Sequence, residues 1–317
     1  MDVQTLVDGI LGGDRRAVAR AISMVEDGAD GLAEVSSGLY PHTGTAYTIG
    51  LTGSPGVGKS SLAAQLVQAV RSRGLSIGVL AIDPTSPFTG GALLGDRLRM
   101  QSHATDPGVF IRSMATRGHL GGMALAAPEA VRVLDASGKD VVVVETVGVG
   151  QAEVDVATAT DTTLVVVSPG WGDAVQVAKA GILEIADVFV VNKADRDGVV
   201  EAARDLEHML KMGATADWTP PVVKTSAATG EGIDELWDAI ERHRKHLEST
   251  GVGRERRRAR LLAEVEQMVS VQVKERVKAL AAADASLIDD LDERRVDPYR
   301  AVAMLVERVT GAEPSDG

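Results

Sequence analysis

The stretch that decides the fold is Gly53-Ser54-Pro55-Gly56-Val57-Gly58-Lys59-Ser60, which matches the phosphate-binding pattern G-x-x-x-x-G-K-[ST]. An apolar run, Tyr47 to Leu51, precedes it, and apolar residues at helical spacing, Leu62 to Val70, follow it. Glycines let the backbone turn tightly and direct N–H groups at a phosphate, and the positive end of the next helix adds attraction. We therefore predict a strand, a P-loop and a helix, with Lys59 at the outer phosphates and Ser60 as a ligand of Mg²⁺. The candidate nucleotide contacts here are Gly53, Ser54, Pro55, Gly56, Val57, Gly58, Lys59, Ser60 and Ser61.

Composition limits the class of protein. The 317 residues are 44% hydrophobic, enough to build a sizeable core in one large or two modest domains. The net charge of −12 argues against a general nucleic-acid binder, and the absence of cysteine excludes disulfides and thiolate metal sites. No apolar stretch reaches the roughly 20 residues that span a bilayer, and the N-terminus lacks the features of a secretory signal. We expect a cytoplasmic protein that contacts neither nucleic acid nor a membrane.

Three regions differ in their patterns. Residues 1–45 contain apolar stripes at helical spacing and predict an N-terminal helical extension. Residues 46–250 alternate strands with helices, and several strands are apolar at successive positions, as in a parallel sheet covered on both faces. This pattern predicts an α/β domain with a doubly wound, mostly parallel sheet built around the P-loop. Residues 251–317 predict a C-terminal helical arm with an amphipathic stripe. The expected strands after the first are Leu75–Ile82, Val141–Val144, Leu164–Val167, Val188–Val191 and Val222–Val223.

A second motif concerns the base of the nucleotide. Asn192-Lys193-Ala194-Asp195 follows a predicted strand and has the N-K-x-D pattern of GTP-binding proteins. The Asp195 carboxylate can accept hydrogen bonds from the ring N–H and the amine of guanine, whereas adenine presents a lone pair at the ring position. A site built around such a contact rejects the wrong base by roughly 10⁴-fold or more. After the next predicted strand, Ser226 and the Ala227 N–H are expected to complete the guanine site.

Acidic residues at the ends of strands are candidate metal ligands. Glu145 ends one predicted strand, in the sequence Glu145-Thr-Val-Gly148, where most small GTPases carry Asp-x-x-Gly. Asp83 and Asp96 are further candidates beside Ser60. Because Mg²⁺ prefers few protein ligands and several waters, the three acids cannot all bind it directly, and one or more must act through water.

Hydrolysis of a phosphoanhydride mainly requires positioning and charge neutralisation. Besides Lys59, the candidate catalytic groups are Asp96, the Gly148 N–H as a sensor of the γ-phosphate, and Gln151 as a residue that orients water. Spacing does not identify an arginine finger. It leaves open a residue of a partner and four arginines of this chain, Arg97, Arg99, Arg112 and Arg117.

Three longer stretches resemble one family, the MeaB/ArgK-type P-loop GTPases. They are Ala81-Ile-Asp-Pro-Thr-Ser86 leading to Leu94-Gly-Asp-Arg97, then Phe110-Ile-Arg-Ser-Met-Ala-Thr-Arg-Gly-His-Leu-Gly-Gly122, and Glu145-Thr-Val-Gly-Val-Gly-Gln151. The resemblance covers nearly the whole chain, and the Glu-x-x-Gly departure is itself what this family looks like.

The resemblance implies a homodimeric GTPase that uses Mg²⁺ and is a chaperone of adenosylcobalamin-dependent methylmalonyl-CoA mutase, gating cofactor loading and protecting the mutase. It casts Asp173, Gln176 and Lys179 as nucleotide-responsive residues that couple to the mutase. It also casts the C-terminal helices as a dimerisation arm. Which cobalamin-dependent mutase is served, and by which surface, does not follow from it.

Two other functions remain open from the sequence. One is a kinase or transport ATPase of the arginine/ornithine type, against which the guanine-selecting N-K-x-D motif stands. The other is a metal-delivery GTPase, which would need a soft-metal site, whereas this chain has no cysteine and its six histidines are scattered. Comparing GTP with ATP hydrolysis separates the first alternative from a GTPase.

Overall fold

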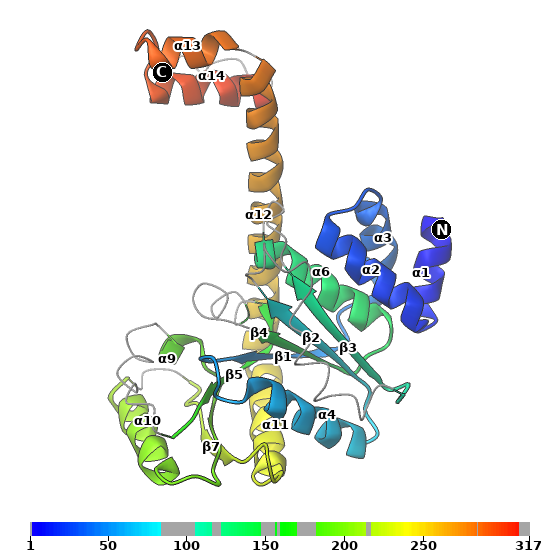
Figure 1. The fold of residues 1–317 in the computed structure, drawn as a ribbon, viewed down its shortest axis with the longest axis vertical. Coiled ribbons are helices and arrows are strands. Elements are labelled where there is room, and N and C mark those ends of the chain that lie inside the picture. The colour runs from blue at the N-terminus through cyan, green and yellow to red at the C-terminus, as the bar shows by residue number, and fades with distance from the viewer. Residues whose placement is uncertain are drawn as a thin grey trace. The chain divides into compact units, whose positions relative to one another are not determined.

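The structure is a computed structural model, and it describes residues 2–83, 105–115, 122–146, 156, 159–169, 182–213, 217–283 and 285–310. Within this part of the chain, seven strands form one sheet in the order β3-β2-β4-β1-β5-β6-β7, and every pairing is parallel (Figure 1). The predicted doubly wound parallel sheet is therefore confirmed. The strands are β1 (Tyr47–Thr52), β2 (Ile77–Asp83), β3 (Val109–Ala115), β4 (Val141–Thr146), β5 (Thr162–Val167), β6 (Val188–Asn192) and β7 (Val222–Thr225).

The strand β1 occupies the point at which the sheet reverses its winding. Ile49 is in register with Val143 of β4 on one side and with Thr162 of β5 on the other. In open α/β sheets, ligands bind beyond the carboxyl ends of the strands at such a switch point. The predicted P-loop follows β1 directly, so the topology places it where a ligand is expected.

Helices cover both faces of the sheet, as alternate side chains of each strand point to opposite faces. In β4, Val141 and Val143 pack toward α4 (Lys59–Ser72) and α11 (Ile233–Thr250). Val142 and Val144 pack on the opposite face against α6 (Gly122–Ala136). The same face is covered further along by α10 (Val199–Gly213), which packs on β5 and β6 (Figure 1). A short helix, α9 (Ile182–Ile185), precedes β6.

The N-terminal extension consists of three helices that pack on α6. They are α1 (Val3–Leu11), α2 (Arg15–Asp27) and α3 (Leu32–Leu39), followed by the 3₁₀ turn η1 (Tyr40–His42). Their apolar stripes, Ile10 and Ile22 among them, are fully buried in one cluster with α6 and the strands β2, β3 and β4. The extension thus belongs to the core of the sheet domain.

The edge strand β3 was not among the predicted strands. It pairs only with β2. Arg112 and Ser113 interrupt its apolar pattern. Polar residues are tolerated here because an edge strand is not covered like a central one. Arg112 donates to Glu26 and Ser23 of α2, at 2.5 and 2.8 Å. Of the four arginines considered as a finger, Arg112 is the one that the structure describes, and it is directed at the N-terminal extension.

The chain divides into two compact units, Met1–Arg260 and Leu261–Gly317. Gly251, with φ of 77°, ends α11 and is followed at once by α12 (Val252–Ala283), whose first turns belong to the first unit. The second unit also holds α13 (Ala285–Asp292), which was not predicted, and α14 (Pro298–Thr310). The Asp297 carboxylate caps α14 by accepting from the N–H groups of Tyr299 and Arg300.

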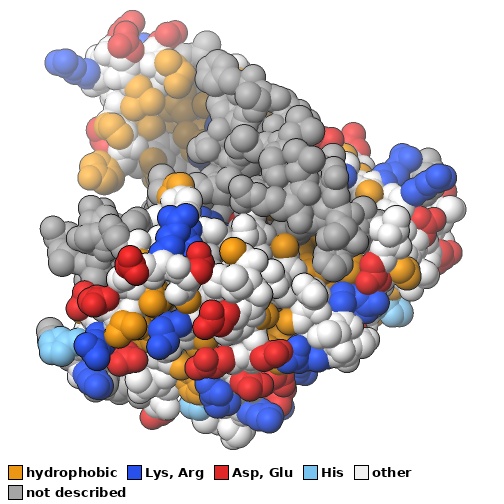
Figure 2. Space-filling view, turned by 60° about the horizontal axis from the view of Figure 1, so that its bottom comes forward, with side chains coloured by type: hydrophobic (Ala, Val, Ile, Leu, Met, Phe, Trp, Pro, Cys, Tyr) orange, Lys and Arg blue, Asp and Glu red, His pale blue; other side chains and the backbone are white. Residues whose placement is uncertain are grey.

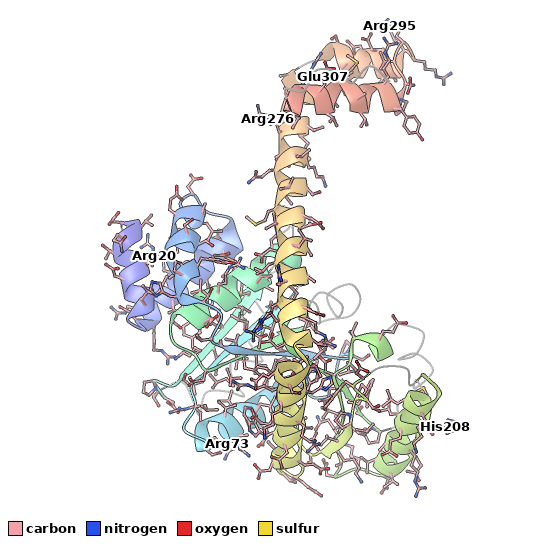
Figure 3. The ribbon with its side chains drawn as sticks, turned by 180° about the vertical axis from the view of Figure 1, so that it is seen from behind. Arg20, Arg73, His208, Arg276, Arg295 and Glu307 are labelled. Carbon is pink, nitrogen blue, oxygen red and sulfur yellow. The ribbon has the colours of Figure 1, made fainter. Side chains whose placement is uncertain are left out.

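No residue of α12 is buried, and its side chains, Arg276 among them, project from the helix (Figure 3). Among the described helices, none combines the length and the apolar character that crossing a bilayer requires. On the face drawn in Figure 2, acidic and basic side chains are interspersed over the surface.

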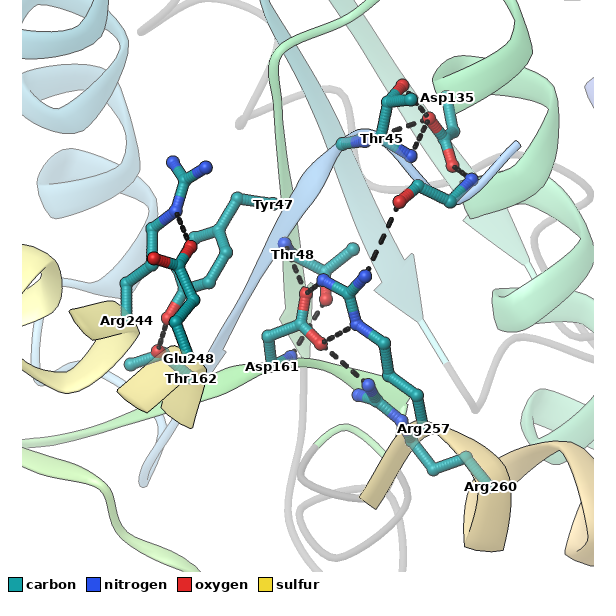
Figure 4. Close-up of polar contacts among 12 residues, drawn as sticks. Thr45, Tyr47, Thr48, Asp135, Asp161, Thr162, Arg244, Glu248, Arg257 and Arg260 are labelled. Carbon is teal, nitrogen blue, oxygen red and sulfur yellow. Dashed lines mark hydrogen bonds and ion pairs between the residues drawn. The ribbon is translucent and has the colours of Figure 1, made fainter. Parts of the chain in front are cut away.

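Two buried aspartates at the amino ends of β5 and β6 hold the first turns of α12. Asp161, which is 5% exposed, accepts from Arg257 at 2.9 and 3.0 Å and from Arg260 at 2.6 Å (Figure 4). Asp187 accepts from Arg256 at 3.0 Å and lies 3.2 Å from the buried His243 ring. Of the five arginines between positions 254 and 260, Arg256, Arg257 and Arg260 are therefore paired within the first unit. Burial by itself would raise the pKa of the Asp161 carboxyl, but Arg257 and Arg260 outweigh it and hold that pKa below its ordinary value.

We expect Asp161→Asn to lower the free energy of unfolding by about 2–3 kcal/mol at pH 7, between the effects of exposed and fully buried ion pairs. A carboxyl whose pKa is depressed on folding stabilises the protein above its unfolded pKa of about 3.9, and that contribution is lost as the pH falls through the folded pKa. The difference between wild type and variant should therefore persist from pH 7 to about pH 5 and narrow only below about pH 4. Urea denaturation across this range measures it, and a difference that vanished already near pH 6 would contradict the assignment.

Candidate nucleotide-binding site

The loop after β1 has a conformation that only glycine tolerates at two positions. Gly53 has φ of 134°, and a Cβ there would lie 2.2 Å from the Val166 carbonyl oxygen of β5. Gly58 has φ of 98°, and a Cβ there would lie 2.4 Å from the side-chain nitrogen of Asn192. Side chains at these positions would push the loop off the sheet edge or away from the N-K-x-D loop.

Lys59 and Ser60 begin α4, directly after Gly58. The Lys59 ammonium donates to the carbonyl oxygens of Gly53 and Ser54, at 2.5 and 3.1 Å, and the residue is only 7% exposed. It therefore lies across the loop, at the positive end of α4, whose first turn contains no acidic residue. A helix N-terminus and an ammonium together form a strong anion-binding arrangement.

Ser60 of α4 and Glu145 of β4 form a hydrogen bond at the carboxyl edge of the sheet. The Ser60 hydroxyl donates to Glu145 Oε1 at 2.6 Å, and Glu145, at the end of β4, is 1% exposed. A hydroxyl and a carboxylate are hard oxygen donors, and one or two protein ligands beside phosphate oxygens and water are what Mg²⁺ uses in nucleotide sites. The described residues contain no group of three or more His, Cys, Asp or Glu that could form an all-protein metal site. The donor set thus fits Mg²⁺ bound together with a nucleotide.

Asn192 joins three loops at the carboxyl edge of the sheet. Its side-chain nitrogen donates to the Val57 carbonyl of the P-loop at 2.8 Å. Its side-chain oxygen accepts from the Thr225 hydroxyl at 3.2 Å and from the Ala227 N–H at 3.1 Å. Because Asn192 is 1% exposed, these bonds are protected from water. The neighbouring Lys193, in the left-handed region with φ of 64°, donates from its ammonium to the Gly56 carbonyl at 2.6 Å.

Asp195 is exposed at the end of this loop and is fixed on one side by Ser226. The buried Ser226 hydroxyl donates to Asp195 Oδ1 at 2.7 Å. This hydrogen bond is the largest cause that holds the pKa of the Asp195 carboxyl below its ordinary value. The group is therefore an ionised acceptor at neutral pH.

The remaining predicted residues are only partly placed. The backbone of Asp83 ends β2 at the same edge of the sheet, where the preceding Ile82 is in register with Thr146. The other predicted residues, Asp96, Gly148, Gln151, Asp173, Gln176 and Lys179, lie outside the described residues, as do Arg97, Arg99 and Arg117.

Two contacts of the loop that follows β7 and contains Ser226 and Ala227, here called the base-side loop, were not predicted as functional. The Thr225 hydroxyl orients Asn192, and the Gln65 side chain of α4 donates to the Ala227 carbonyl at 3.0 Å. Thr225 stands beside the Ser-Ala pair and could have been found there. Gln65 belongs to no motif and carried no signal, since polar residues on a helix are usually solvated.

Comparisons with known proteins agree with this geometry. A family model described as "Methylmalonyl Co-A mutase-associated GTPase MeaB" matches residues 18–282. A protein of Pyrococcus abyssi, provisionally named as a GTPase, is 48% identical over 98% of this chain and 97% of its own. The "Methylmalonic aciduria type A homolog, mitochondrial" of Mus musculus is 34% identical over 78% of this chain and 65% of its own. A solved structure of a "LAO/AO transport system kinase" is similar with a TM-score of 0.72, at 26% identity over 97% of each chain.

Proposed function

Since the chain belongs to the MeaB family of methylmalonyl Co-A mutase-associated GTPases, we propose that it binds GTP with Mg²⁺, hydrolyses it to GDP and phosphate, and is a chaperone of an adenosylcobalamin-dependent methylmalonyl-CoA mutase. In this role it gates cofactor loading and protects the mutase. The single observation that carries the nucleotide part is Asn192, which bonds the P-loop at Val57 and the base-side loop at Ala227. One side chain thereby joins a phosphate-binding element to a base-reading element.

The residues of the site divide the work in a defined way. The P-loop amides and Lys59 bind the phosphates and offset their negative charge. Ser60 and Glu145 hold Mg²⁺, which supplies further neutralisation at the phosphate oxygens when bound. Asp195 and the amides of the base-side loop orient the purine. Asp83, Asp96, Gly148 and Gln151 keep the roles that the sequence predicts for metal binding and for hydrolysis, and the proposal assigns them no geometry.

We expect the isolated protein to hydrolyse GTP slowly and to accelerate when the mutase is added. The physical reason is that the motif spacing identifies no arginine finger in this chain. Arg112, the one candidate arginine that the structure describes, is paired with Glu26. An arginine supplied at the transition state typically accelerates hydrolysis by about 10³–10⁵-fold. The rate of phosphate release, measured with and without the purified mutase, should rise by at least about tenfold when the mutase is added. This threshold is set well below the effect of an arginine finger.

The controls for this measurement separate the possible partners and substrates. The same assay with ATP should give no comparable turnover, which distinguishes a GTPase from a transport ATPase. A cobalamin-independent enzyme of similar size should not stimulate hydrolysis. Full-speed turnover by the protein alone, indifferent to the mutase, would contradict the regulatory role. In that role, Asp173, Gln176 and Lys179 are proposed to transmit the nucleotide state to the mutase.

The second unit supports a homodimer. Along α12, apolar residues spaced by three and four are exposed to an unusual degree: Leu262 by 61%, Val265 by 55%, Val269 by 53% and Val273 by 37%. A stripe of this kind on one side of a helix is costly in water and is typical of a helix that packs on another chain. We propose that a second copy of this helix covers it.

The variant Val269→Asp places a charge in the middle of this stripe and should convert a dimer into a monomer. Gln267→Asp is the matched control, since it changes the net charge equally on the other side of the same exposed helix. Light scattering at equal protein concentrations reads the mass of each variant. A dimer that survived the Val269 substitution unchanged would place the interface elsewhere.

A further inference from the structure

The base-side loop that follows β7 is held from two directions. From the N-K-x-D loop, the Asn192 side-chain oxygen accepts the Ala227 N–H. From α4, the Gln65 side-chain nitrogen donates to the Ala227 carbonyl at 3.0 Å, across 162 positions of sequence. A Cβ built on Gly230 would lie 3.5 Å from Gln65 Oε1, so the turn of this loop closes around the Gln65 amide.

A bond to a carbonyl fixes more than that carbonyl. In a trans peptide, the C=O and the following N–H lie in one plane and point in opposite directions. The Gln65 bond to the Ala227 carbonyl therefore also sets the direction of the Ala228 N–H, which points away from α4. Together, Asn192 and Gln65 set the orientation of both loop amides, those of Ala227 and Ala228.

Gln65 is not needed to hold α4 on the sheet. The adjacent Leu62 and Leu66 are fully buried and hold α4 on the sheet without it. Gln68, one turn further along, is exposed. Gln65 is instead half-buried, and its hydrogen bond to the loop is also partly buried.

We propose that Gln65 is a positioning residue for recognition of the 6-oxygen of the purine. This inference rests on the proposed function, because it assumes that the Ala228 amide faces guanine. Asp195 reads the ring N–H and the 2-amine, whereas the Ala228 N–H, which Gln65 orients, reads the oxygen on the opposite edge of the base. The Ala227 N–H, which was expected at this oxygen from the sequence, donates to Asn192 Oδ1 instead. In this proposal Gln65 acts through the loop backbone, by its bond to the Ala227 carbonyl, and not by contact with the nucleotide or the metal.

The test uses three nucleoside diphosphates in competition with a fluorescent GDP. GDP carries both edge groups, and IDP keeps the 6-oxygen and lacks the 2-amine. The 2-aminopurine riboside diphosphate keeps the 2-amine but lacks the 6-oxygen and, with it, the ring N–H; the second loss is the same for wild type and variant and cancels when they are compared. In Gln65→Ala, the affinities for GDP and IDP should fall by the same factor, about 3- to 10-fold for one hydrogen bond. The affinity for the 2-aminopurine nucleotide should stay within a factor of two.

Matched variants make the result specific. Gln68→Ala, on the same helix, should leave all three affinities unchanged. Gln65→Glu keeps the size of the side chain but loses its donor, so it should reproduce the selective loss, and thermal unfolding shows whether each variant retains its fold. Equal losses for all three nucleotides, or no loss for GDP, would overturn the role of Gln65. A wild type that bound GDP no better than the 2-aminopurine nucleotide would instead overturn the proposed guanine site itself.

Discussion

The Asp195→Asn variant is expected to lose affinity for GTP by about 10²–10⁴-fold and to gain affinity for xanthosine triphosphate. The carboxylate has two acceptor oxygens for the two donors on that edge of guanine. Asparagine replaces one acceptor with an NH₂ donor, which opposes a donor of guanine. Xanthine has an oxygen where guanine has the amine, so its edge pairs with the carbonyl and the NH₂ group of asparagine. The exchange of preference therefore follows from matching donors to acceptors.

The structure makes this substitution a clean experiment. Asp195 is exposed, and among the described residues the side-chain hydrogen bond that it accepts comes from Ser226 at 2.7 Å, which an asparagine oxygen can accept equally well. The substitution should therefore change the free energy of unfolding only slightly. Asp197→Asn, an exposed residue two positions along, removes the same charge and should leave both affinities unchanged. A variant that kept its GTP affinity would show that Asp195 does not read the base.

Lys59→Ala is expected to weaken GTP binding by about 30- to 5,000-fold, the range found when one partner of a buried charged pair is truncated. The Lys59 ammonium lies across the P-loop on the carbonyl oxygens of Gly53 and Ser54, close to where the outer phosphates are proposed to bind. Removing it leaves phosphate charge that the loop amides alone offset poorly. Isothermal titration with GTP and Mg²⁺ measures the loss.

The fold should survive this change, because the sheet and α4 are held by apolar contacts on both faces. Lys245→Ala, on the exposed side of α11, changes the net charge equally and should not affect binding. Circular dichroism and thermal unfolding verify that both variants are folded. Normal GTP binding by Lys59→Ala would remove the ammonium from the proposed site.

How far the sequence predicts this molecule depends on the range of the interactions involved. The P-loop and N-K-x-D motifs are short, and each follows a recognisable parallel strand. Since the carboxyl ends of such strands meet at one edge, the meeting of Ser60 with Glu145 was predictable. The conformation of Gly53 was also predictable, as its motif requires glycine for a close approach to the sheet.

Other features depend on contacts between residues far apart in the sequence, which no local pattern predicts. Gln65 contacts Ala227 across 162 positions, and Arg257 contacts Asp161 across 96. A cluster of arginines on a helix is ordinarily solvated, so the sequence did not indicate that two buried aspartates hold α12. The strand β3 escaped prediction because Arg112 interrupts its apolar pattern. The edge position of the strand and the pairing of the arginine with Glu26 of the N-terminal extension accommodate it there.

The central proposal is that this sheet edge binds a guanine nucleotide and selects it through Asp195. The most direct measurement is displacement of fluorescent GDP from the wild-type protein by unlabelled GTP and by ATP, with Mg²⁺ present. We expect half-displacement by ATP only at concentrations about 10³-fold or more above those of GTP, since adenine presents a lone pair to the carboxylate and no 6-oxygen to the loop amides. Displacement by ATP at concentrations similar to those of GTP would contradict the nucleotide assignment and the function proposed from it.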